Sequence, residues 1–455
     1  MTPLEYLKQT ESKRLEELFK FLRFPSVSTK SEHRQDLIAC AEWLKNHLCD
    51  IGIKAEVVPT GGHPLVYGEY TAGRNLPTIL YYGHYDVQPA EPFDLWKSPP
   101  FDPVIKSGYI WARGSSDNKG QLFIHVKGLE AVLKATGSLP VNVKLLFEGE
   151  EEVHSAHLPG WIKKNRKKLQ ADIAVVSDTA MFGPDLPAVT FGLRGIASVE
   201  VFVYGPSRDV HSGSFGGAIA NPANTLASLI AKLHDKDGRV AIPGFYDQVK
   251  PLTKWERSQF KKLPYNQAEY VKSLGVPALQ GEKGYSTYER TWGRPTCDVN
   301  GLTSGYQGEG AKTIIPSYAS CKITMRLVPD QDPWDACEKI EKYLKRIAPK
   351  SVRLKIDKHG GAKAVMVPQE GPWLDAAARA IKAGFGKNPV FMKEGGSIPI
   401  VGDFKSNLGV DTLLIGFCQN DDNIHSPNER FKLRDFERGC KTAAALPFEL
   451  AGVKV

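Results

Sequence analysis

Side chains of the kinds that bind metal ions or transfer protons follow short apolar runs at five places in this sequence. These residues are, in chain order, His84 with Asp86, then Asp117, then Glu150 to Glu152, then Asp178, and finally His425. Imidazole and carboxylate groups together suit zinc, and also manganese or cobalt. If the apolar runs are strands of one open α/β sheet, ligands are bound outside their carboxyl ends. The five segments would then deliver their side chains to one edge.

The spacing within two of these segments suggests separate tasks. His84 and Asp86 are two residues apart and point to the same face of a strand, where Asp86 can accept a hydrogen bond from the ring nitrogen that binds no metal. Glu151 and Glu152 are adjacent, so both reach one site only if the chain turns there, which Gly149 permits. One carboxylate could then bind metal while its neighbour accepts a proton from an activated water.

Each residue alone also has an ordinary structural explanation. A histidine beside a strand, such as His84, is more often a hydrogen-bonded structural residue than a metal ligand. An acidic residue after a strand, such as Asp117, is commonly the N-cap of the next helix. The occurrence of such residues after several apolar runs favours the metal site.

Strands and helices in alternation must position these residues. From residue 33 to about 190, helical patterns alternate with apolar runs at 78–82, 109–112, 141–147 and 172–176. This alternation predicts an α/β fold with a mainly parallel sheet covered by helices. The pattern resumes from Gly371, with a helix at 373–384 and a strand at 412–417. We therefore expect a discontinuous domain of residues 1–190 and 364–455.

The pattern between residues 191 and 363 is different. Residues 197–204, 321–328 and 352–357 alternate apolar and polar side chains, so each is predicted to be a strand with one exposed face. Helical patterns at 218–235 and 333–348 lie between them. They predict an inserted α+β domain with its helices on one side of the sheet. Residues 244–282 fit no period well and are expected to be irregular or helical.

Composition restricts the class of protein. A chain of 455 residues is too long for one ordinary core, which favours two domains. Lys and Arg exceed Asp and Glu by 59 − 51 = 8, but the basic residues are scattered, so nucleic acid is not an expected partner. Seven cysteines without a CxxC pair indicate a reduced, cytoplasmic protein. The first 24 residues fit an amphipathic helix rather than a signal peptide, and no apolar run is long enough to span a membrane.

Two other enzyme classes are not supported. The glycine-rich residues 305–313 lack the glycine that a phosphate-binding loop needs before Lys312, and Ile314 and Ile315 continue as a strand. A serine hydrolase of the Gly-x-Ser-x-Gly type is excluded because no serine stands in that motif.

The motifs, in their order, resemble those of the dinuclear metallopeptidases that include carnosinases, aminoacylases, desuccinylases and glutamate carboxypeptidase. The similarity is closest to the carnosinase-like cytosolic dipeptidases. The motifs are Gly-His-Tyr-Asp-Val at 83–87, Arg-Gly-Ser-Ser-Asp-Asn-Lys-Gly at 113–120, Glu-Gly-Glu-Glu-Glu at 148–152, Val-Ser-Asp at 176–178, His-Ser-Gly at 211–213, Gly-Ala-Lys-Thr-Ile-Ile-Pro at 310–316, Arg-Leu-Val-Pro at 326–329, His-Gly-Gly at 359–361, Glu-Gly-Gly-Ser-Ile-Pro at 394–399 and His-Ser-Pro-Asn-Glu at 425–429.

The resemblance implies a role for each matching residue. Asp117 would bridge two metal ions, with His84 and Asp178 completing one site and Glu152 and His425 the other. Glu151 would be the general base and Asp86 the carboxylate that orients the site. A cis peptide between Asp117 and Asn118 is implied as well. The residues that would hold the substrate are Thr313, Arg326, His359 and Ser397, with Arg326 the partner of a terminal carboxylate.

The resemblance further implies a metal-dependent hydrolase that cleaves dipeptides or similar small peptides. Zinc is the first candidate metal, and manganese and cobalt also fit. The inserted domain would be a lid that forms a homodimer, with His211 reaching the partner subunit's active site. An N-acyl-amino-acid amidohydrolase is the alternative enzyme. A non-catalytic binding protein would have lost the base or a ligand, and all are present. One departure is His154, near which the family usually has Gly-Ser.

Overall fold

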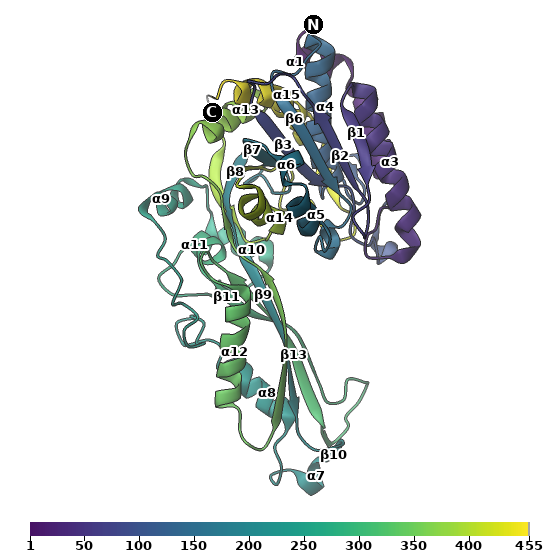
Figure 1. Cartoon of the computed structure of the whole chain (residues 1–455). Helices are drawn as coiled ribbons and strands as arrows, with labels where there is room; N and C mark the ends of the chain where they lie inside the picture. The colour runs from purple at the N-terminus through teal and green to yellow at the C-terminus, as the bar shows by residue number, and fades with distance from the viewer. Residues whose placement is uncertain (454–455) are drawn as a thin grey trace. The chain divides into compact units, whose positions relative to one another are not determined.

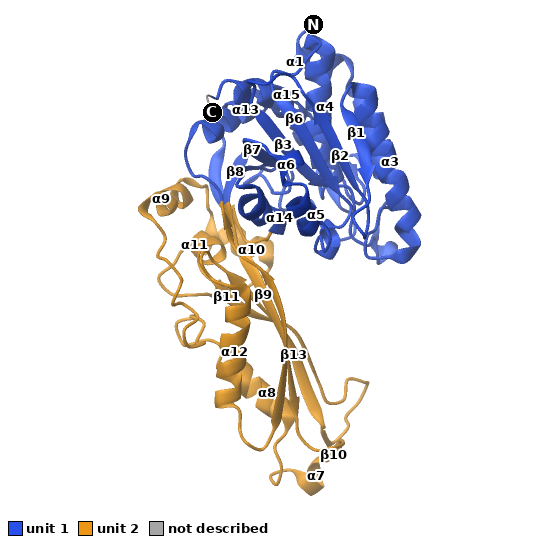
Figure 2. Ribbon diagram, viewed as in Figure 1, with its two compact units in different colours: residues 1–191, 367–392, 398–455 blue, residues 192–366, 393–397 orange. Residues whose placement is uncertain are grey.

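A computed structural model describes residues 1–453, and the chain divides into two compact units (Figure 2). Unit 1 consists of residues 1–191, 367–392 and 398–455, and unit 2 of residues 192–366 and 393–397. The domain boundaries expected from the sequence, after residues 190 and 363, lie within three residues of the unit boundaries after residues 191 and 366. The return of residues 393–397 to unit 2 had no counterpart in the prediction.

The main sheet of unit 1 has a parallel centre and antiparallel flanks (Figure 1). The four central strands, in spatial order β6, β3, β7 and β17, are parallel. β1 and β2 on one side and β8 on the other are antiparallel additions. The bounds are β1 (Lys54–Val58), β2 (Leu65–Tyr70), β3 (Thr78–His84), β6 (Asn142–Glu148), β7 (Ile173–Val176), β8 (Ala188–Leu193) and β17 (Asp411–Ile415). The predicted mainly parallel α/β sheet is confirmed in its centre.

Helices pack on both faces of this sheet. On one face, the ring of Tyr81 lies 5.2 Å from that of His125 on α4, and on the other, Tyr82 lies 5.8 Å from Phe404, which follows α14. The two neighbours in β3 are both buried, which explains the continuous apolar run in the sequence. The helices of unit 1 are α1 (Pro3–Gln9), α2 (Glu11–Leu22), α3 (Arg34–Ile51), α4 (Lys119–Thr136), α5 (Leu158–Lys164), α6 (Arg166–Leu169), α13 (Pro372–Phe385), α14 (Pro399–Asp403) and α15 (Leu433–Ala451).

One strand that the sequence placed in the parallel series belongs to a different sheet. β5 (Tyr109–Trp111) forms a small antiparallel sheet with β4 (Val104–Lys106) and β18 (Arg430–Lys432). The physical reason is a two-residue hairpin between β4 and β5, in which Ser107 and Gly108 both have positive φ, as the favoured hairpin turn requires. The interpretation of residues 109–112 as a strand of the main sheet was therefore wrong.

Unit 2 is built on a four-stranded antiparallel sheet with the order β11-β13-β9-β14. Alternate residues of β9 are buried and pack with α8 and α12 in one apolar core. The strands are β9 (Gly195–Tyr204), β10 (Val210–His211), β11 (Thr296–Ser304), β12 (Ile314–Ile315), β13 (Tyr318–Leu327), β14 (Arg353–Ala362) and β15 (Val365–Met366), with β16 (Val390–Glu394) ending here. The helices are α7 (Ser212–Phe215), α8 (Pro222–Ala231), α9 (Lys254–Lys262), α10 (Gln267–Leu274), α11 (Thr287–Gly293) and α12 (Pro333–Ile347).

The segment 244–282, expected to be irregular or helical, contains α9 and α10, and a buried ion pair joins α9 to Lys393. Glu256 on α9 accepts a hydrogen bond of 2.5 Å from the Nζ of Lys393, and both side chains are buried. The edge strand β11 was missed because most of its residues are exposed and show no alternation. None of the helices in the described residues combines the length and apolar character that a membrane span needs.

Candidate metal centre

Five segments of unit 1 bring the predicted ligands to the carboxyl edge of the sheet. His84 ends β3, Asp178 follows β7, and Glu152 lies in a short turn after β6. His425 belongs to the loop between β17 and β18, and Asp117 to the loop before α4. Because β6, β3, β7 and β17 are parallel neighbours, their carboxyl ends meet at one edge. The parallel topology thus places residues that are far apart in sequence in one cluster.

The Asp117 carboxylate lies between two histidines. Its Oδ1 is 3.1 Å from the Nε2 of His84, and its Oδ2 is 2.9 Å from the Nε2 of His425. On the first side, Asp178 Oδ1 is 3.7 Å from the His84 Nε2, and on the second, Glu152 Oε2 is 3.4 Å from the His425 Nε2. The five side chains therefore form two groups that share Asp117, each with one imidazole and one further carboxylate.

The loop that carries Asp117 is not a helix cap. Asn118, not Asp117, precedes α4, and it forms no side-chain hydrogen bond to the helix. The side-chain nitrogen of Asn118 donates to Asp178 Oδ1 over 2.8 Å. The peptide bond between Asp117 and Asn118 is cis, which confirms that expectation. The structural alternative for Asp117 was therefore wrong.

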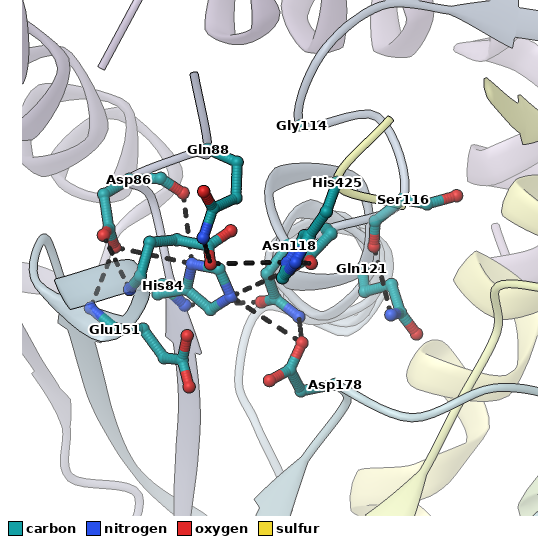
Figure 3. A network of polar contacts seen from close by, with 12 residues as sticks. His84, Asp86, Gln88, Gly114, Ser116, Asn118, Gln121, Glu151, Asp178 and His425 are labelled. Atoms are coloured by element: carbon teal, nitrogen blue, oxygen red, sulfur yellow. Dashed lines mark hydrogen bonds and ion pairs between the residues drawn. The ribbon is translucent and has the colours of Figure 1, made fainter. Parts of the chain in front are cut away.

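Asp86 contacts both His84 and the turn that carries Glu151 and Glu152. The His84 Nδ1 lies 3.1 Å from the backbone oxygen of Asp86 and 3.4 Å from its carboxylate Oδ1 (Figure 3). The carboxylate accepts hydrogen bonds from the backbone N–H groups of Glu151 and Glu152, at 3.2 and 3.0 Å. The ring nitrogen thus faces both the backbone oxygen and the carboxylate of Asp86. The same carboxylate also holds the turn after β6.

Burial and mutual charge perturb the titration of the cluster. Burial opposes the charged form of His84, but its carboxylate neighbours, Asp117 first, raise its pKa well above 6.5. Hydrogen bonds to Asp117 and then Glu152 raise the pKa of His425 to about 10. Burial raises the pKa of Glu151 well above 4.5, and the carboxylates of Asp178 and Glu152 add to the rise. The centre has more carboxylates than its two imidazoles can neutralise, a surplus that divalent cations would offset.

The donor set fits divalent metals. One donor atom each from His84, Asp117 and Glu152 lie within 4.8 Å of one another. The Oε1 of Glu152 is buried and lacks a hydrogen-bond partner. Buried polar atoms are normally satisfied, so an unsatisfied carboxylate oxygen in this cluster indicates a ligand. Nitrogen and carboxylate oxygen donors suit zinc, manganese or cobalt.

Comparison with known proteins assigns the family. The sequence model of peptidase family M20/M25/M40 matches residues 80–448, a range that contains all five predicted ligands. The chain belongs to this family. The recognition of dinuclear metallopeptidase motifs in the sequence is thereby confirmed, and the chain is an enzyme rather than a non-catalytic binding protein.

Relatives in the family match nearly the whole chain. The Cys-Gly metallodipeptidase dug1 of Schizosaccharomyces pombe is 31% identical and covers 96% of this chain and 95% of its own length. The structure of the M20 family metallo-carboxypeptidase Sso-CP2 from Sulfolobus solfataricus has a TM-score of 0.87 and 35% identity, with 97% of this chain and 99% of that one covered. Human carnosine dipeptidase 1 has a TM-score of 0.85 and 28% identity, covering 99% and 98%.

His154, the departure from the family pattern, lies in the turn after the glutamates. Its φ is 70°, and that of Ser155 is 47°, so both adopt the left-handed conformation that glycine prefers. The side chain of His154 is exposed. The structure thus accommodates the histidine by turning it toward solvent.

The remaining predicted site residues belong to unit 2. His211 lies in β10 next to β12, and its backbone neighbour Ser212 donates to the carbonyl of Thr313. Arg326 on β13 and Ser397 lie together, with 3.5 Å between Arg326 Nη1 and Ser397 Oγ. His359 is an exposed residue of β14.

The sequence assigned no role to Glu429, although the residue ends the His425 motif. It is fully buried, and its Oε2 accepts from Arg113 Nη1 and the backbone N–H of Gly114, at 2.8 and 2.9 Å. Its Oε1 accepts from the backbone N–H groups of Ser116 and Asp117, at 2.9 and 3.1 Å. One carboxylate therefore fixes the loop of the shared ligand to the segment that carries His425.

Glu429→Gln is expected to weaken metal binding roughly 10- to 100-fold, as loss of a group that orients ligands does. The glutamine amide has one oxygen that can accept hydrogen bonds, where the carboxylate has two. Its NH₂ group would therefore face N–H donors that now bond to the second oxygen of Glu429. Metal affinity is measured by competition with a chromogenic chelator. Glu437→Gln, which removes a partner of the buried Arg14 elsewhere in unit 1, is the matched control. Equal affinities in both variants and the wild type would contradict the role.

Proposed function

We propose that this chain hydrolyses the peptide bond of dipeptides, using two divalent metal ions held by His84, Asp178, Glu152 and His425 and shared by Asp117. The observation that carries the proposal is the position of Asp117, whose two carboxylate oxygens each face a different histidine, at 3.1 and 2.9 Å. A single carboxylate placed in this way is suited to two ions at close spacing.

Different residues of the chain transfer the proton, position the glutamates and bind the substrate. Bound divalent ions supply Lewis acidity, which lowers the pKa of water and polarises a carbonyl. Glu151 accepts the proton of the attacking water and returns it to the leaving amine. Asp86 holds Glu151 and Glu152 through their backbone N–H groups. The proposed substrate-binding residues are Thr313, Arg326, His359 and Ser397, with Arg326 on the terminal carboxylate.

The choice of dipeptides rests on the named activities of the relatives. These include Cys-Gly metallodipeptidases of three yeasts and Beta-Ala-His dipeptidases of rat, mouse and human, at 28–32% identity. The alternative of an N-acyl-amino-acid amidohydrolase has less support. Zinc is the proposed metal, with manganese and cobalt as the other candidates, and a cytoplasmic location stays a prediction.

Metal analysis with a substrate panel tests the function. The purified protein is expected to hold two metal equivalents and to cleave Cys-Gly or β-Ala-His. N-acetylated amino acids and tripeptides complete the panel. Preferential cleavage of the N-acetylated compounds would assign the deacylase activity instead. A protein with both metals that cleaves nothing in the panel would contradict the proposal.

A homodimer formed by unit 2 is part of the same proposal, with His211 as a donor to the reacting carbonyl oxygen in the partner subunit. His211 Nδ1 accepts a hydrogen bond of 3.0 Å from the backbone N–H of Gly213. The proton of the neutral ring is thereby placed on Nε2, which is an exposed donor. A structural alternative for His211 is that it caps the helix expected to begin near Ala218, but that helix, α8, is capped by Asn221, and His211 caps the short α7 instead.

Mixing Glu151→Gln and His211→Ala subunits under exchange conditions is expected to restore activity. A mixed dimer pairs one intact Glu151 with the other subunit's intact His211. Random pairing in a two-fold dimer would return about one quarter of the wild-type rate. Each variant alone is the control, with His211→Ala losing about 3 to 4 kcal/mol of transition-state stabilisation. No recovery despite subunit exchange would mean that His211 does not act across the dimer.

A further inference from the structure

A large cavity in unit 2 has two arginines in its wall that lack a carboxylate partner. The cavity has a volume of about 1160 Å³, and its wall holds Arg194 and Arg326 together with further charged residues of both signs, from β11 and from the segments around residues 235 and 281. No ion pair in the described residues joins Arg194 or Arg326 to a carboxylate. The other arginine deep in the wall, Arg294, is satisfied by two hydrogen bonds of 2.7 Å to Glu282. Arg290 and the exposed Lys236 of the same wall also form no ion pair among the described residues, but only Arg194 and Arg326 contact Ser397.

Arg194, unlike Arg326, was given no role by the sequence. Its Nε and Nη1 atoms are buried without a hydrogen-bond partner. Burial, together with the charge of Arg326, lowers the pKa of Arg194 to about 10. A guanidinium removed from water without acceptors is costly, and it is normally retained where an anion binds.

The position of Arg194 is fixed relative to the proposed substrate-binding residues. Ser397 donates from Oγ to the backbone oxygen of Arg194 over 2.5 Å, and Arg326 Nη1 donates to the same Oγ over 3.5 Å. A Cβ on Gly395 would lie 2.9 Å from the Nη2 of Arg194, so the glycine leaves room for the guanidinium. Ser397 thus joins the two arginines in one polar cluster.

The positive charges of Arg194 and Arg326 indicate that the ligand is an anion. Asp298 on β11 is the carboxylate whose charge acts on both arginines, and it is exposed. One substrate carboxylate, the terminal one, would neutralise Arg326. A second anionic group is needed for Arg194.

We propose that Arg194 binds the side-chain carboxylate of a C-terminal glutamate or aspartate, while Arg326 holds the terminal carboxylate of the same residue. The proposal rests on the proposed dipeptidase function and specifies its substrates. The enzyme is expected to cleave dipeptides with an acidic C-terminal residue faster than dipeptides whose C-terminal residue is uncharged.

Comparison of Ala-Glu with Ala-Gln tests the subsite, since the two differ in the charge of one group. A charge-assisted hydrogen bond predicts a kcat/KM roughly 10- to 100-fold higher for Ala-Glu in the wild type. Arg194→Met should reduce the ratio to near one, and Arg194→Lys should keep part of it. Lys236→Met removes an exposed cation from the same cavity wall and should leave the ratio unchanged.

A binding readout separates recognition from catalysis. L-Glutamate, the product of Ala-Glu, should inhibit the wild type more strongly than L-glutamine, and Arg194→Met should abolish this difference. Cleavage of both dipeptides at equal rates by the wild type would overturn the subsite and leave the dipeptidase function intact. Failure to cleave any dipeptide would instead overturn the function. A ratio lost equally in Lys236→Met would assign the preference to general positive charge and overturn the role of Arg194.

Discussion

Replacing Glu151 with glutamine is expected to lower kcat roughly 10²- to 10⁴-fold, the usual contribution of a general base, while both metals stay bound. The amide cannot accept a proton from water. The contacts that hold the turn after β6 go from the backbone N–H of Glu151 to Asp86, so the substitution leaves them in place. Single-turnover kinetics together with metal analysis measure the two effects separately.

Glu150→Gln is the matched control, because it removes the same charge one residue away. The Glu150 carboxylate accepts from the backbone N–H of His63 at 3.0 Å and contacts His157 Nδ1 at 2.9 Å, outside the ligand cluster. Its kcat should stay far above that of Glu151→Gln. Substantial turnover by Glu151→Gln would assign the base to another residue.

Asp117→Ala is expected to abolish the binding of at least one metal and to lower activity roughly a thousandfold or more, since several kcal/mol of charge stabilisation are lost with the ions. The reason is that Asp117 is the shared member of both ligand groups, whereas every other ligand belongs to one. Calorimetric titration with zinc or manganese counts the equivalents that remain.

Asp178→Ala provides the comparison. It lies on the His84 side, so it should weaken one metal site and retain the other. Removal of the shared ligand should have the larger effect. Two full equivalents bound by Asp117→Ala would refute the bridging position.

The ligand cluster could be predicted from the sequence because parallel strands place their carboxyl ends at one edge. His84, Glu152 and Asp178 each follow a buried strand, and this signal is local. Asp117 was found by the same rule for a wrong reason, since β5 is not part of the main sheet. A two-residue hairpin with positive φ at Ser107 and Gly108 decided that pairing, and hairpin pairing cannot be distinguished from a parallel strand by hydrophobicity alone.

Residues whose contacts are with distant parts of the chain could not be predicted from the sequence. Glu429 binds the backbone N–H of Asp117 across a separation of 312 residues, and nothing near position 429 indicates this. The hydrogen bond from Ser397 Oγ to the backbone oxygen of Arg194 is likewise a contact between distant parts of the chain. By contrast, the contact between His84 and Asp86 depends on local spacing and was predicted.

The short segment 393–397 limits how the molecule can be divided. A fragment of residues 192–366 would lack Lys393, leaving the buried Glu256 carboxylate unpaired at a cost of about 3 to 5 kcal/mol. It would also lack Ser397, which joins Arg194 to Arg326. A chimaera that exchanges unit 2 between family members therefore has to transfer both stretches of chain, 192–366 and 393–397. A chimaera that receives only the longer stretch is expected to be destabilised.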